Sequence, residues 1–446
     1  MALTGLEIYK LLPQTNCKEC SFPTCLAFAM KLAAKQAELK ACPYVSEESK
    51  VKLEAASAPP IRLVEIAGDD GKFAVGNETV LFRHEKTFFH RPGLFLRLKD
   101  SLPLEELKKQ AAAADAYKAD YVGIPLTLDG FAVEAAGDPA AFAAAVKAVR
   151  SVSKKPLILL ASAPEAAKAG LEAAQGVRPL LHAANSGNWQ AMAEVAKAAK
   201  VPLAVRADTL DELATLTQSL TQAGLEDLVL DPGVMGPKDS LEKLTTLRRL
   251  AVKKNFRPLG FPIITFPGAS GKADEVLLAA EHIAKYAGFI VLENFDPASL
   301  YGLLVLRQNI YTDPQKPIQM EPKLYEIGAP GPDSPLMITT NFSLTYFSVA
   351  GEVESAGFPA WLLVADSDGQ SVLTGWAAGK FDAEKIAKTV KDSGIADRIS
   401  HKKLVIPGHV AGLSGEVEEE LPGWQIMVGP RDAVDIPNYI KNVWSA

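Results

Sequence analysis

Short apolar runs alternate with longer amphipathic stretches along most of the chain from residue 94 onward. The apolar runs are short and rich in β-branched residues, which is typical of buried strands, and a helical pattern follows each of them. Eight such units in succession predict a (β/α)8 TIM barrel, and an open sheet with an extra strand is the alternative. The predicted strands are 94–98, 121–126, 156–161, 179–184, 202–207, 227–232, 262–267 and 289–294.

Two further features belong to the predicted barrel. The segments "KFAVG" and "ETVLFR", around Gly76-Asn77, predict a hairpin that plugs its bottom. Polar residues stand at the C-terminal ends of several strands, where barrel enzymes place their chemistry, but they include no nucleophile paired with a base and no Gly-rich phosphate loop. Helix capping by Asp208 and a turn at Asp231 explain them equally well, so a scaffold role is the alternative. These residues are Asn185, Arg206, Asp208, Asp231 and Glu293.

The pattern changes after a segment dense in proline and glycine, which predicts a new domain from residue 326. Strand-like runs again alternate with helical ones, as in a doubly wound α/β fold, where ligands bind beyond the carboxyl ends of the strands. Small and hydroxyl-bearing residues dominate those ends, with Thr340 and Thr374 as donors to a large flat ligand. Helix capping is the competing role for Thr340, Asn341 and Asp432. The predicted strands are 335–340, 360–366, 370–375, 402–408 and 424–429.

All four cysteines stand near the front of the chain, with the spacing C-x2-C-x4-C-x16-C. Four thiolates suit a tetrahedral zinc ion or a four-iron cluster. Three of them come from one loop and the distant fourth precedes Pro43, which favours a [4Fe-4S] cluster over zinc or a redox dithiol. The flanking segments 3–12 and 25–39 predict short amphipathic helices. The predicted metal ligands are Cys17, Cys20, Cys25 and Cys42.

Composition narrows the range of partners. Lys and Arg number 47 against 53 Asp and Glu, a net charge of -6, and no basic block interleaved with aromatics would follow a phosphate backbone. The N-terminus has no basic segment before an apolar core, and no run approaches the ~18 apolar residues of a membrane helix. We therefore expect a cytoplasmic protein without nucleic acid or membrane as a partner.

The order of these parts resembles a known family. The cysteine loop and the segments "ACPYVS", "TTNFSLTYFSVAGEVE", "DGQSVLTGWAAGKF" and "IPGHVAGLSGEVEEELPGWQIMVGPRDA" are similar to the large (gamma) subunits of the corrinoid iron-sulfur protein of the reductive acetyl-CoA (Wood-Ljungdahl) pathway. The resemblance covers the whole chain. It implies a [4Fe-4S] domain at 1–57, the barrel at 58–325 and a Rossmann-like corrinoid (cobalamin)-binding domain at 326–446.

The resemblance also implies a function. Co(I) of a bound corrinoid would accept a methyl group from methyltetrahydrofolate through a separate methyltransferase and deliver it to the acetyl-CoA synthase/CO dehydrogenase. The cluster would return Co(II) to Co(I), with electrons from a partner such as ferredoxin. A small subunit would complete a heterodimer and cover the corrinoid. The chain would be a methyl-carrier subunit rather than a stand-alone enzyme.

The same resemblance assigns contacts to the corrin ring or its nucleotide tail, with Thr374 nearest the cobalt. Many cobalamin domains use a D-x-H-x-x-G loop whose histidine ligates cobalt from below, and this motif is absent here. His409 fits a helix cap or a phosphate contact better than a metal ligand. A base-off corrinoid without a protein lower ligand is therefore implied, which makes Co(II) easier to reduce. The implied contacts are Thr340, Tyr346, Gln370, Ser371, Val372, Leu373, Thr374 and Ala433.

Two other functions stay open on the residues alone. "VLDPG" after the sixth strand and Asn185 after the fourth suit a barrel that is itself a pterin-binding methyltransferase. The cysteine loop alone suits an iron-sulfur electron-transfer and docking subunit without an organic cofactor.

Overall fold

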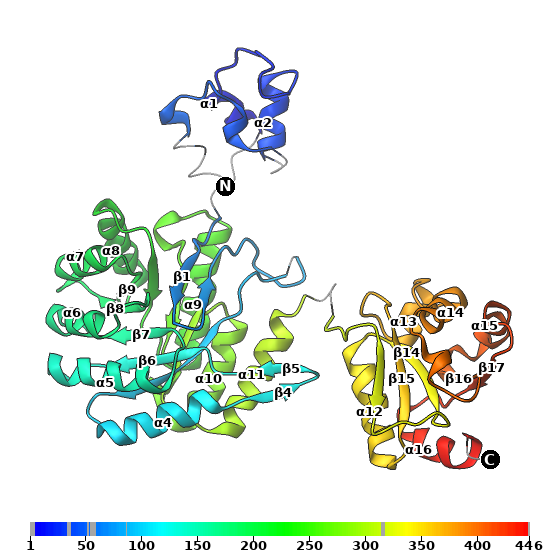
Figure 1. Cartoon of the computed structure of the whole chain (residues 1–446). Helices are drawn as coiled ribbons and strands as arrows, with labels where there is room; N and C mark the ends of the chain where they lie inside the picture. The colour runs from blue at the N-terminus through cyan, green and yellow to red at the C-terminus, as the bar shows by residue number, and fades with distance from the viewer. Residues whose placement is uncertain are drawn as a thin grey trace. The chain divides into compact units, whose positions relative to one another are not determined.

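The computed structural model describes residues 5–33, 37–50, 53, 59–85, 87–313 and 317–444 (Figure 1). The chain divides into two compact units, Met1–Ala119 with Leu126–Tyr311, and Asp120–Pro125 with Thr312–Ala446. None of the described helices combines the length and apolarity needed to cross a membrane.

The N-terminal segment folds around its cysteines. Helices α1 (Gly5–Leu11) and α2 (Cys25–Ala33) form where short helices are predicted, and a 3-10 turn, η1 (Leu39–Ala41), precedes Cys42. Three thiols belong to the hydrophobic core, together with apolar side chains from both helices. The buried members of this core are Ile8, Leu12, Cys20, Cys25, Phe28, Ala29, Cys42, Val45 and Leu53.

Eight parallel strands form the central barrel, with a helix after each (Figure 1). A parallel bridge between Leu230 and Ile263 joins the two ends of the sheet, which confirms the barrel over an open sheet. The strands are β3 (Gly93–Lys99), β6 (Gly130–Glu134), β7 (Leu157–Leu160), β8 (Leu180–Ala184), β9 (Leu203–Arg206), β10 (Leu228–Asp231), β11 (Ile264–Thr265) and β12 (Phe289–Leu292). The helices are α4 (Leu104–Ala116), α5 (Pro139–Val152), α6 (Pro164–Ala173), α7 (Trp189–Ala199), α8 (Leu210–Gln222), α9 (Gly236–Val252), α10 (Lys272–Ala284) and α11 (Pro297–Tyr311).

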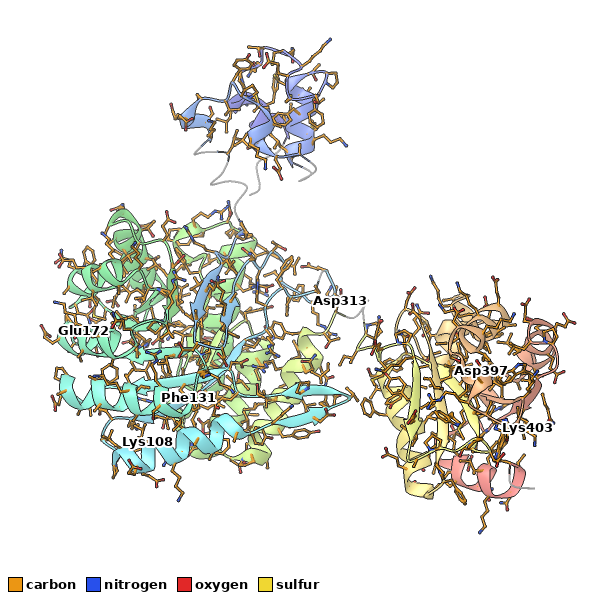
Figure 2. All side chains as sticks on the ribbon, in the orientation of Figure 1. Lys108, Phe131, Glu172, Asp313, Asp397 and Lys403 are labelled. Atoms are coloured by element: carbon orange, nitrogen blue, oxygen red, sulfur yellow. The ribbon has the colours of Figure 1, made fainter. Side chains whose placement is uncertain are left out.

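Side chains in this part follow the predicted layering. Phe131 on β6 is fully buried, whereas Lys108 and Glu172 lie on the surrounding helices α4 and α6 (Figure 2). Burial of β-branched and aromatic side chains on both faces of a parallel sheet is what produces its near-continuous apolar runs.

The plug of the barrel pairs differently from the prediction. Strand β2 (Lys72–Val75) lies within "KFAVG", but its antiparallel partner is β1 (Val64–Ala67), upstream in the chain. "ETVLFR" forms no strand, because Glu78 in it accepts hydrogen bonds from the backbone N–H groups of Phe89 and His90 and binds the following loop instead. The hairpin does plug the barrel, since its apolar side chains share one core with those of the barrel strands.

The second predicted barrel strand, 121–126, is wrong. Those residues form a tight hairpin of β4 (Ala119–Tyr121) and β5 (Ile124–Leu126), because Val122 and Gly123 both take positive φ, at 46° and 80°. Two such residues in succession reverse the chain as a two-residue turn does. The barrel strand is β6 instead, whose first four residues are buried.

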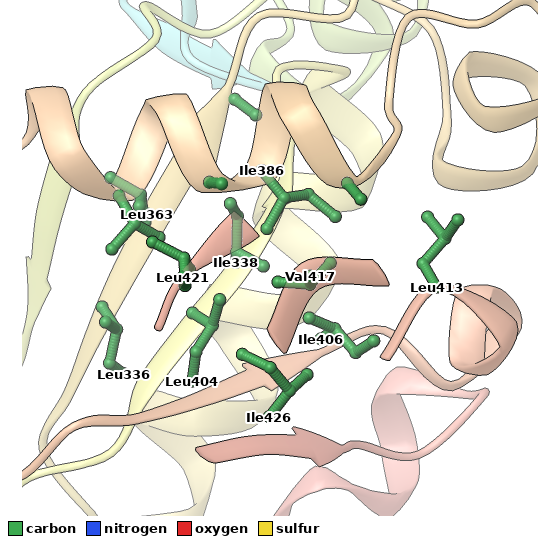
Figure 3. Packing of buried hydrophobic residues seen from close by; sticks show 14 of the residues in the cluster. Leu336, Ile338, Leu363, Ile386, Leu404, Ile406, Leu413, Val417, Leu421 and Ile426 are labelled. Carbon is green, nitrogen blue, oxygen red and sulfur yellow. The ribbon is translucent and has the colours of Figure 1, made fainter. Parts of the chain in front are cut away.

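The C-terminal unit contains a five-stranded sheet in the order β13-β15-β14-β16-β17, parallel except for the edge strand β13. One apolar core joins Leu336 and Ile338 to Ile386 and Val417 on one face of the sheet (Figure 3). A second core includes Met337 on the other face, so the unit is doubly wound. The strands are β13 (Leu324–Ile327), β14 (Leu336–Thr340), β15 (Ala360–Ala365), β16 (Lys403–Ile406) and β17 (Gln425–Val428). The helices are α12 (Ser343–Ala356), α13 (Val372–Ala377), α14 (Ala383–Asp392), α15 (Ser414–Glu420) and α16 (Ile436–Tyr439).

The predicted strand 370–375 is wrong, because most of it forms helix α13. Asp368 and Gly369 take positive φ, at 56° and 72°, and turn the chain back after β15. The Gly375 N–H then bonds the Ser371 carbonyl at 2.7 Å, which begins a helix. Strand β13, which the sequence analysis missed, takes the remaining edge of the sheet.

Candidate functional site

The four cysteines lie on one short loop and on the turn after η1. Cys17 is exposed, whereas Cys20, Cys25 and Cys42 are buried. The loop is fixed to α2 by Asn16, whose Oδ1 accepts a hydrogen bond from the Cys25 N–H at 2.8 Å. The loop therefore presents its thiols from a defined backbone.

That backbone is unusual, because four of its non-glycine residues are left-handed. Gln14, Asn16, Lys18 and Ser21 have φ values of 58°, 50°, 67° and 67°. Left-handed residues at such short intervals bend the chain sharply, so the loop between α1 and α2 is a tight one.

The thiols also influence one another. Burial raises the pKa of the Cys42 thiol, while a backbone hydrogen bond at Tyr44 lowers it. The other three cysteine thiols raise the same pKa further, which places all four within electrostatic reach. Within the described residues, no group of three or more His, Cys, Asp or Glu side chains could hold a single metal ion.

A second candidate site is a cavity of about 420 Å³ at the carboxyl edge of the C-terminal sheet. It lies between β14 and β16, where the order of the sheet reverses, which is the position at which doubly wound folds bind ligands. Its lining comes from the ends of β14, β16 and β17 and from α12 and α13. The lining residues are Met337–Thr339, Leu344, Thr345, Ser348, Val349, Ser371–Leu373, Val405–Pro407, His409, Gly429–Ala433 and Ile436.

Buried hydroxyl groups at this edge have no partner in the protein. Thr339 lines the cavity with 2% of its surface exposed, and Thr340 beside it is fully buried. The Oγ1 atoms of both residues, the Ser343 Oγ and the Gln370 Oε1 are buried without a hydrogen bond. Because a buried polar group without a partner costs about 1–3 kcal/mol, the hydroxyl of Thr339, the one of these residues in the cavity lining, fits a polar ligand that enters the cavity.

The cofactor contacts named from the sequence are placed unevenly. Ser371, Val372, Leu373 and Ala433 line the cavity. The structure places the other four next to that lining or within the neighbouring core. Thr340 is buried beside Thr339, and Gln370 directly precedes the lining residue Ser371. Thr374 is exposed, and its hydroxyl lies 3.0 Å from that of Ser371. Tyr346 is 9% exposed and packs against the rings of Tyr325 and Phe347.

Sequence reasoning named Tyr346 on α12 but missed the four residues of this helix that line the cavity. Leu344, Thr345, Ser348 and Val349 line the cavity from one face of this helix, at helical spacing. In the segment "SLTYFSVAGEVE", this face of the helix carries hydroxyl groups where a solvent-exposed face usually carries charged residues. That difference could have indicated a ligand-binding face from the sequence.

Two rim loops of the cavity touch through Gly408. A Cβ atom there would lie 2.5 Å from the Gly429 carbonyl oxygen. The Gly408 N–H bonds the Pro430 carbonyl at 3.0 Å, and the Gly429 N–H bonds the Ile406 carbonyl at 2.8 Å. These contacts fix the loops after β16 and β17 as one wall, to which His409 belongs.

Asn341 fixes the opposite wall rather than capping α12. Its side chain is 1% exposed, and its Oδ1 accepts from the Ser367 N–H and hydroxyl, both at 2.9 Å, and from the Gly369 N–H at 3.0 Å. Its Nδ2 donates to Gln319 and Asp366. Asn341 therefore sets the loop that leads into α13 and its cavity-lining residues.

The polar residues predicted at the barrel rim come together only in part. Arg206 and Asp231 line a separate cavity at the barrel mouth, while Asn185, Asp208 and Glu293 are outside its lining. Thr209, rather than Asp208, caps α8 by accepting from the Glu212 N–H at 3.3 Å. Asp231 does form the predicted turn, with its Oδ1 2.9 Å from the Gly233 N–H.

The chain matches known proteins over its whole length. A family model described as "CO dehydrogenase/acetyl-CoA synthase delta subunit" matches residues 64–440, and one described as "Putative Fe-S cluster" matches residues 12–44. The "Corrinoid/iron-sulfur protein large subunit" of Moorella thermoacetica is 46% identical over 442 residues, 99% of each chain. The "Acetyl-CoA decarbonylase/synthase complex subunit gamma" of Archaeoglobus fulgidus is 38% identical over 98% of each chain. A dihydropteroate synthase structure from Thermus thermophilus covers 55% of this chain and 99% of its own, with 18% identity and a TM-score of 0.37.

The fold and its sites define a class of α/β protein that joins a four-thiol loop to a parallel barrel and a doubly wound domain with a ligand cavity. Within this class, the chain belongs to the family of corrinoid/iron-sulfur protein large subunits and acetyl-CoA decarbonylase/synthase gamma subunits.

Replacement of Asn341 tests the wall that it holds. Asn341→Ala leaves the N–H groups of Ser367 and Gly369 unpaired, so we expect the free energy of unfolding to fall by about 3 kcal/mol. Urea unfolding followed by tryptophan fluorescence measures this change, because four of the five tryptophans lie in residues 361–444. Asn438→Ala, at an exposed asparagine, is the control and should change the value by less than about 0.5 kcal/mol. Equal midpoints for both variants would contradict the assigned role.

Proposed function

We propose that this chain is the methyl-carrying subunit of a corrinoid-dependent methyl transfer system. A corrinoid in the C-terminal domain would supply a cobalt that accepts a methyl group and gives it up again, and the protein would bind, orient and shield it. The observation that carries the proposal is the buried hydroxyl of Thr339, which lines the cavity without a partner in the protein. The name of the Moorella relative includes the corrinoid, and that of the Archaeoglobus relative includes an acetyl-CoA decarbonylase/synthase complex.

The cavity suits part of such a ligand. Its volume, about 420 Å³, is within the range of small-molecule sites, and apolar and hydroxyl-bearing side chains dominate its lining. Leu344 and Leu373 line it although they are 50% and 45% exposed. Exposed leucines at the mouth of a cavity are explained by a large ring that covers them. We propose that Thr340, Gln370, Thr374 and Tyr346, which lie next to the lining, also belong to the corrinoid site.

The N-terminal loop would hold an iron-sulfur cluster of the [4Fe-4S] type. Four thiols, three of them buried, and the spacing of the ligands support this assignment. A four-iron cluster takes one thiolate for each iron atom, so its ligands need not converge on one point. Its role would be to return an oxidised corrinoid to service.

The division of labour follows the three domains that we propose, 1–57, 58–325 and 326–446. We further propose that the partners are a small subunit, a methyltetrahydrofolate methyltransferase, the acetyl-CoA synthase/CO dehydrogenase and an electron donor such as ferredoxin. The exposed Cys17, next to three buried ligands, gives the cluster one edge that an electron donor could approach.

Thr339→Val tests the corrinoid site. The substitution removes a hydroxyl that has no partner in the protein, so the free energy of unfolding should stay equal or rise. Corrinoid affinity should fall by about tenfold, measured as corrinoid retained on dialysis of the anaerobic heterodimer and read by mass spectrometry. Thr389→Val, which removes an α14 hydroxyl bonded to its own helix, is the control. No corrinoid in wild-type protein from corrinoid-replete cells would overturn the proposal.

The cobalt is proposed to lack a protein ligand, although His409 lines the cavity. The Co(II) electron paramagnetic resonance spectrum should then show no nitrogen splitting from the protein, and His409→Ala should leave it unchanged. A nitrogen splitting that disappears in His409→Ala would instead make His409 the lower ligand.

Cys20→Ala tests the proposed role of the cluster. Methyl transfer from protein reduced beforehand to Co(I) should be retained, whereas reactivation of Co(II) should be lost. Circular dichroism of both proteins controls for folding, because Cys20 also belongs to the N-terminal core. Equal loss of both activities would mean that the cluster is structural.

A further inference from the structure

The mouth of the barrel contains a cavity of about 300 Å³ that the proposed methyl carrier does not use. It lies at the carboxyl ends of the barrel strands, the end where TIM barrels bind small molecules. One part of its lining is apolar and includes Leu160, Val234, Met235 and Phe266. The other part is charged and contains two groups of residues, one around Arg97 and one around Arg206.

The first charged group is fully paired. Arg97 donates from Nε to Glu134 Oε2 at 2.9 Å and from Nη1 to Glu293 Oε1 at 2.5 Å, and its Nη2 also bonds Glu134. Each of its three nitrogen atoms thus has a carboxylate partner, so this group builds the wall of the cavity.

The second charged group, around Asp231 and Arg206, contains one guanidinium nitrogen that makes no hydrogen bond. Asp231 is 4% exposed, and it accepts from His182 Nε2 at 2.8 Å and from the Gly233 N–H at 2.9 Å. Arg206 Nη2 donates to the exposed Asp208 at 2.9 Å. Arg206 Nη1 is buried without a hydrogen-bond partner and lies 3.6 Å from Asp231 Oδ1, too far for a hydrogen bond.

Gly233 allows this arrangement. A Cβ atom at residue 233 would lie 1.7 Å from Arg206 Nη1, so only glycine leaves room for the guanidinium group at this point. The φ of Gly233 is also positive, at 58°. The absence of a side chain at residue 233 therefore lets the Arg206 guanidinium group lie beside Asp231.

We infer that this cavity binds a planar heterocycle through a lactam edge, a ring carbonyl next to a ring N–H. The carbonyl would accept from Arg206 Nη1, and the N–H would donate to Asp231 Oδ1. The flat ring would lie against the apolar lining that includes Phe266 and Met235.

The charges favour a neutral ligand over an anion. Arg97 and Arg206 balance Glu134 and Asp231 within the lining, so the lining has no net positive charge. A carboxylate bonded to Arg206 Nη1 would also lie close to the Asp231 carboxylate, and like charges at that distance repel. A lactam edge satisfies the donor and the acceptor together without this repulsion.

Calorimetric titration of the full chain tests the inference with two matched ligands. Pterin carries the lactam edge, and 2,4-diaminopteridine has the same rings with an amidine edge in its place. We expect pterin to bind at least about tenfold more tightly, because the diamine offers a donor to Arg206 where an acceptor is needed. Benzoate, a planar carboxylate, should bind no better than the diamine.

Variants assign the binding to Arg206. Arg206→Met should reduce pterin affinity by about tenfold, and Arg206→Lys serves if the first variant does not fold. Arg62→Met is the matched control, because Arg62 is a similarly exposed barrel arginine, paired with Glu226 outside this cavity. The inference is overturned if neither pteridine binds, if both bind equally, if benzoate binds better than pterin or if Arg206→Met binds like wild type. Corrinoid content has no bearing on these outcomes, so this site and the proposed methyl carrier fail separately.

Discussion

Parallel strand direction is the constraint on which both ligand cavities depend. In the barrel all strands are parallel, and in the C-terminal sheet only the edge strand β13 is not. The carboxyl ends of such strands meet at one edge, so residues far apart in the sequence become neighbours there. Arg97 and Glu293 bond each other across 196 positions of the chain for this reason. The buried apolar side chains of the strands stabilise the fold, so the residues at the strand ends can be polar.

Polar groups at these edges are of two kinds. Asn341 and Arg97 use their hydrogen-bonding capacity within the protein, and each fixes the wall of a cavity. The hydroxyls of Thr339 and Thr340 and the Nη1 of Arg206 are buried and unpaired. Folding alone does not favour groups of the second kind, since each costs about 1–3 kcal/mol when it is left without a partner. These unpaired groups lie beside cavities and are surrounded by groups that have partners. We therefore regard the unpaired groups as binding groups and the paired ones as the structure that supports them.

The sequence predicted what depends on periodicity. Seven of the eight barrel strands and the doubly wound domain follow from alternating apolar and amphipathic runs. The failures at 121–126 and 370–375 share a cause, because Val122, Gly123, Asp368 and Gly369 take positive φ and reverse the chain. Asp368-Gly369 is a recognised turn pair that the neighbouring apolar residues masked, whereas a β-branched residue such as Val122 rarely takes a positive φ, so local preference could not reveal that turn.

The partners of Arg97 and Asp231 at the barrel mouth could not be predicted from the sequence for a different reason. Glu134 and His182 lie within strands, and the order of the strands in the sheet brings them to Arg97 and Asp231. The predicted rim was taken from polar residues at or just beyond the C-terminal ends of the strands, of which only Arg206 and Asp231 line the cavity. Pairing across a closed sheet depends on register, which the alternation of a single strand does not contain.

The N-terminal loop carries a cost that its own core is too small to offset easily. Gln14, Asn16, Lys18 and Ser21 are left-handed, and such a conformation costs about 1–2 kcal/mol for a residue other than glycine. Asn16 recovers part of this cost through its bond to the Cys25 N–H. The buried core around the loop rests on α1, α2 and three of the thiols themselves. A metal centre that binds those thiols contributes its binding free energy directly to folding, and this coupling accounts for a strained loop in so small a segment.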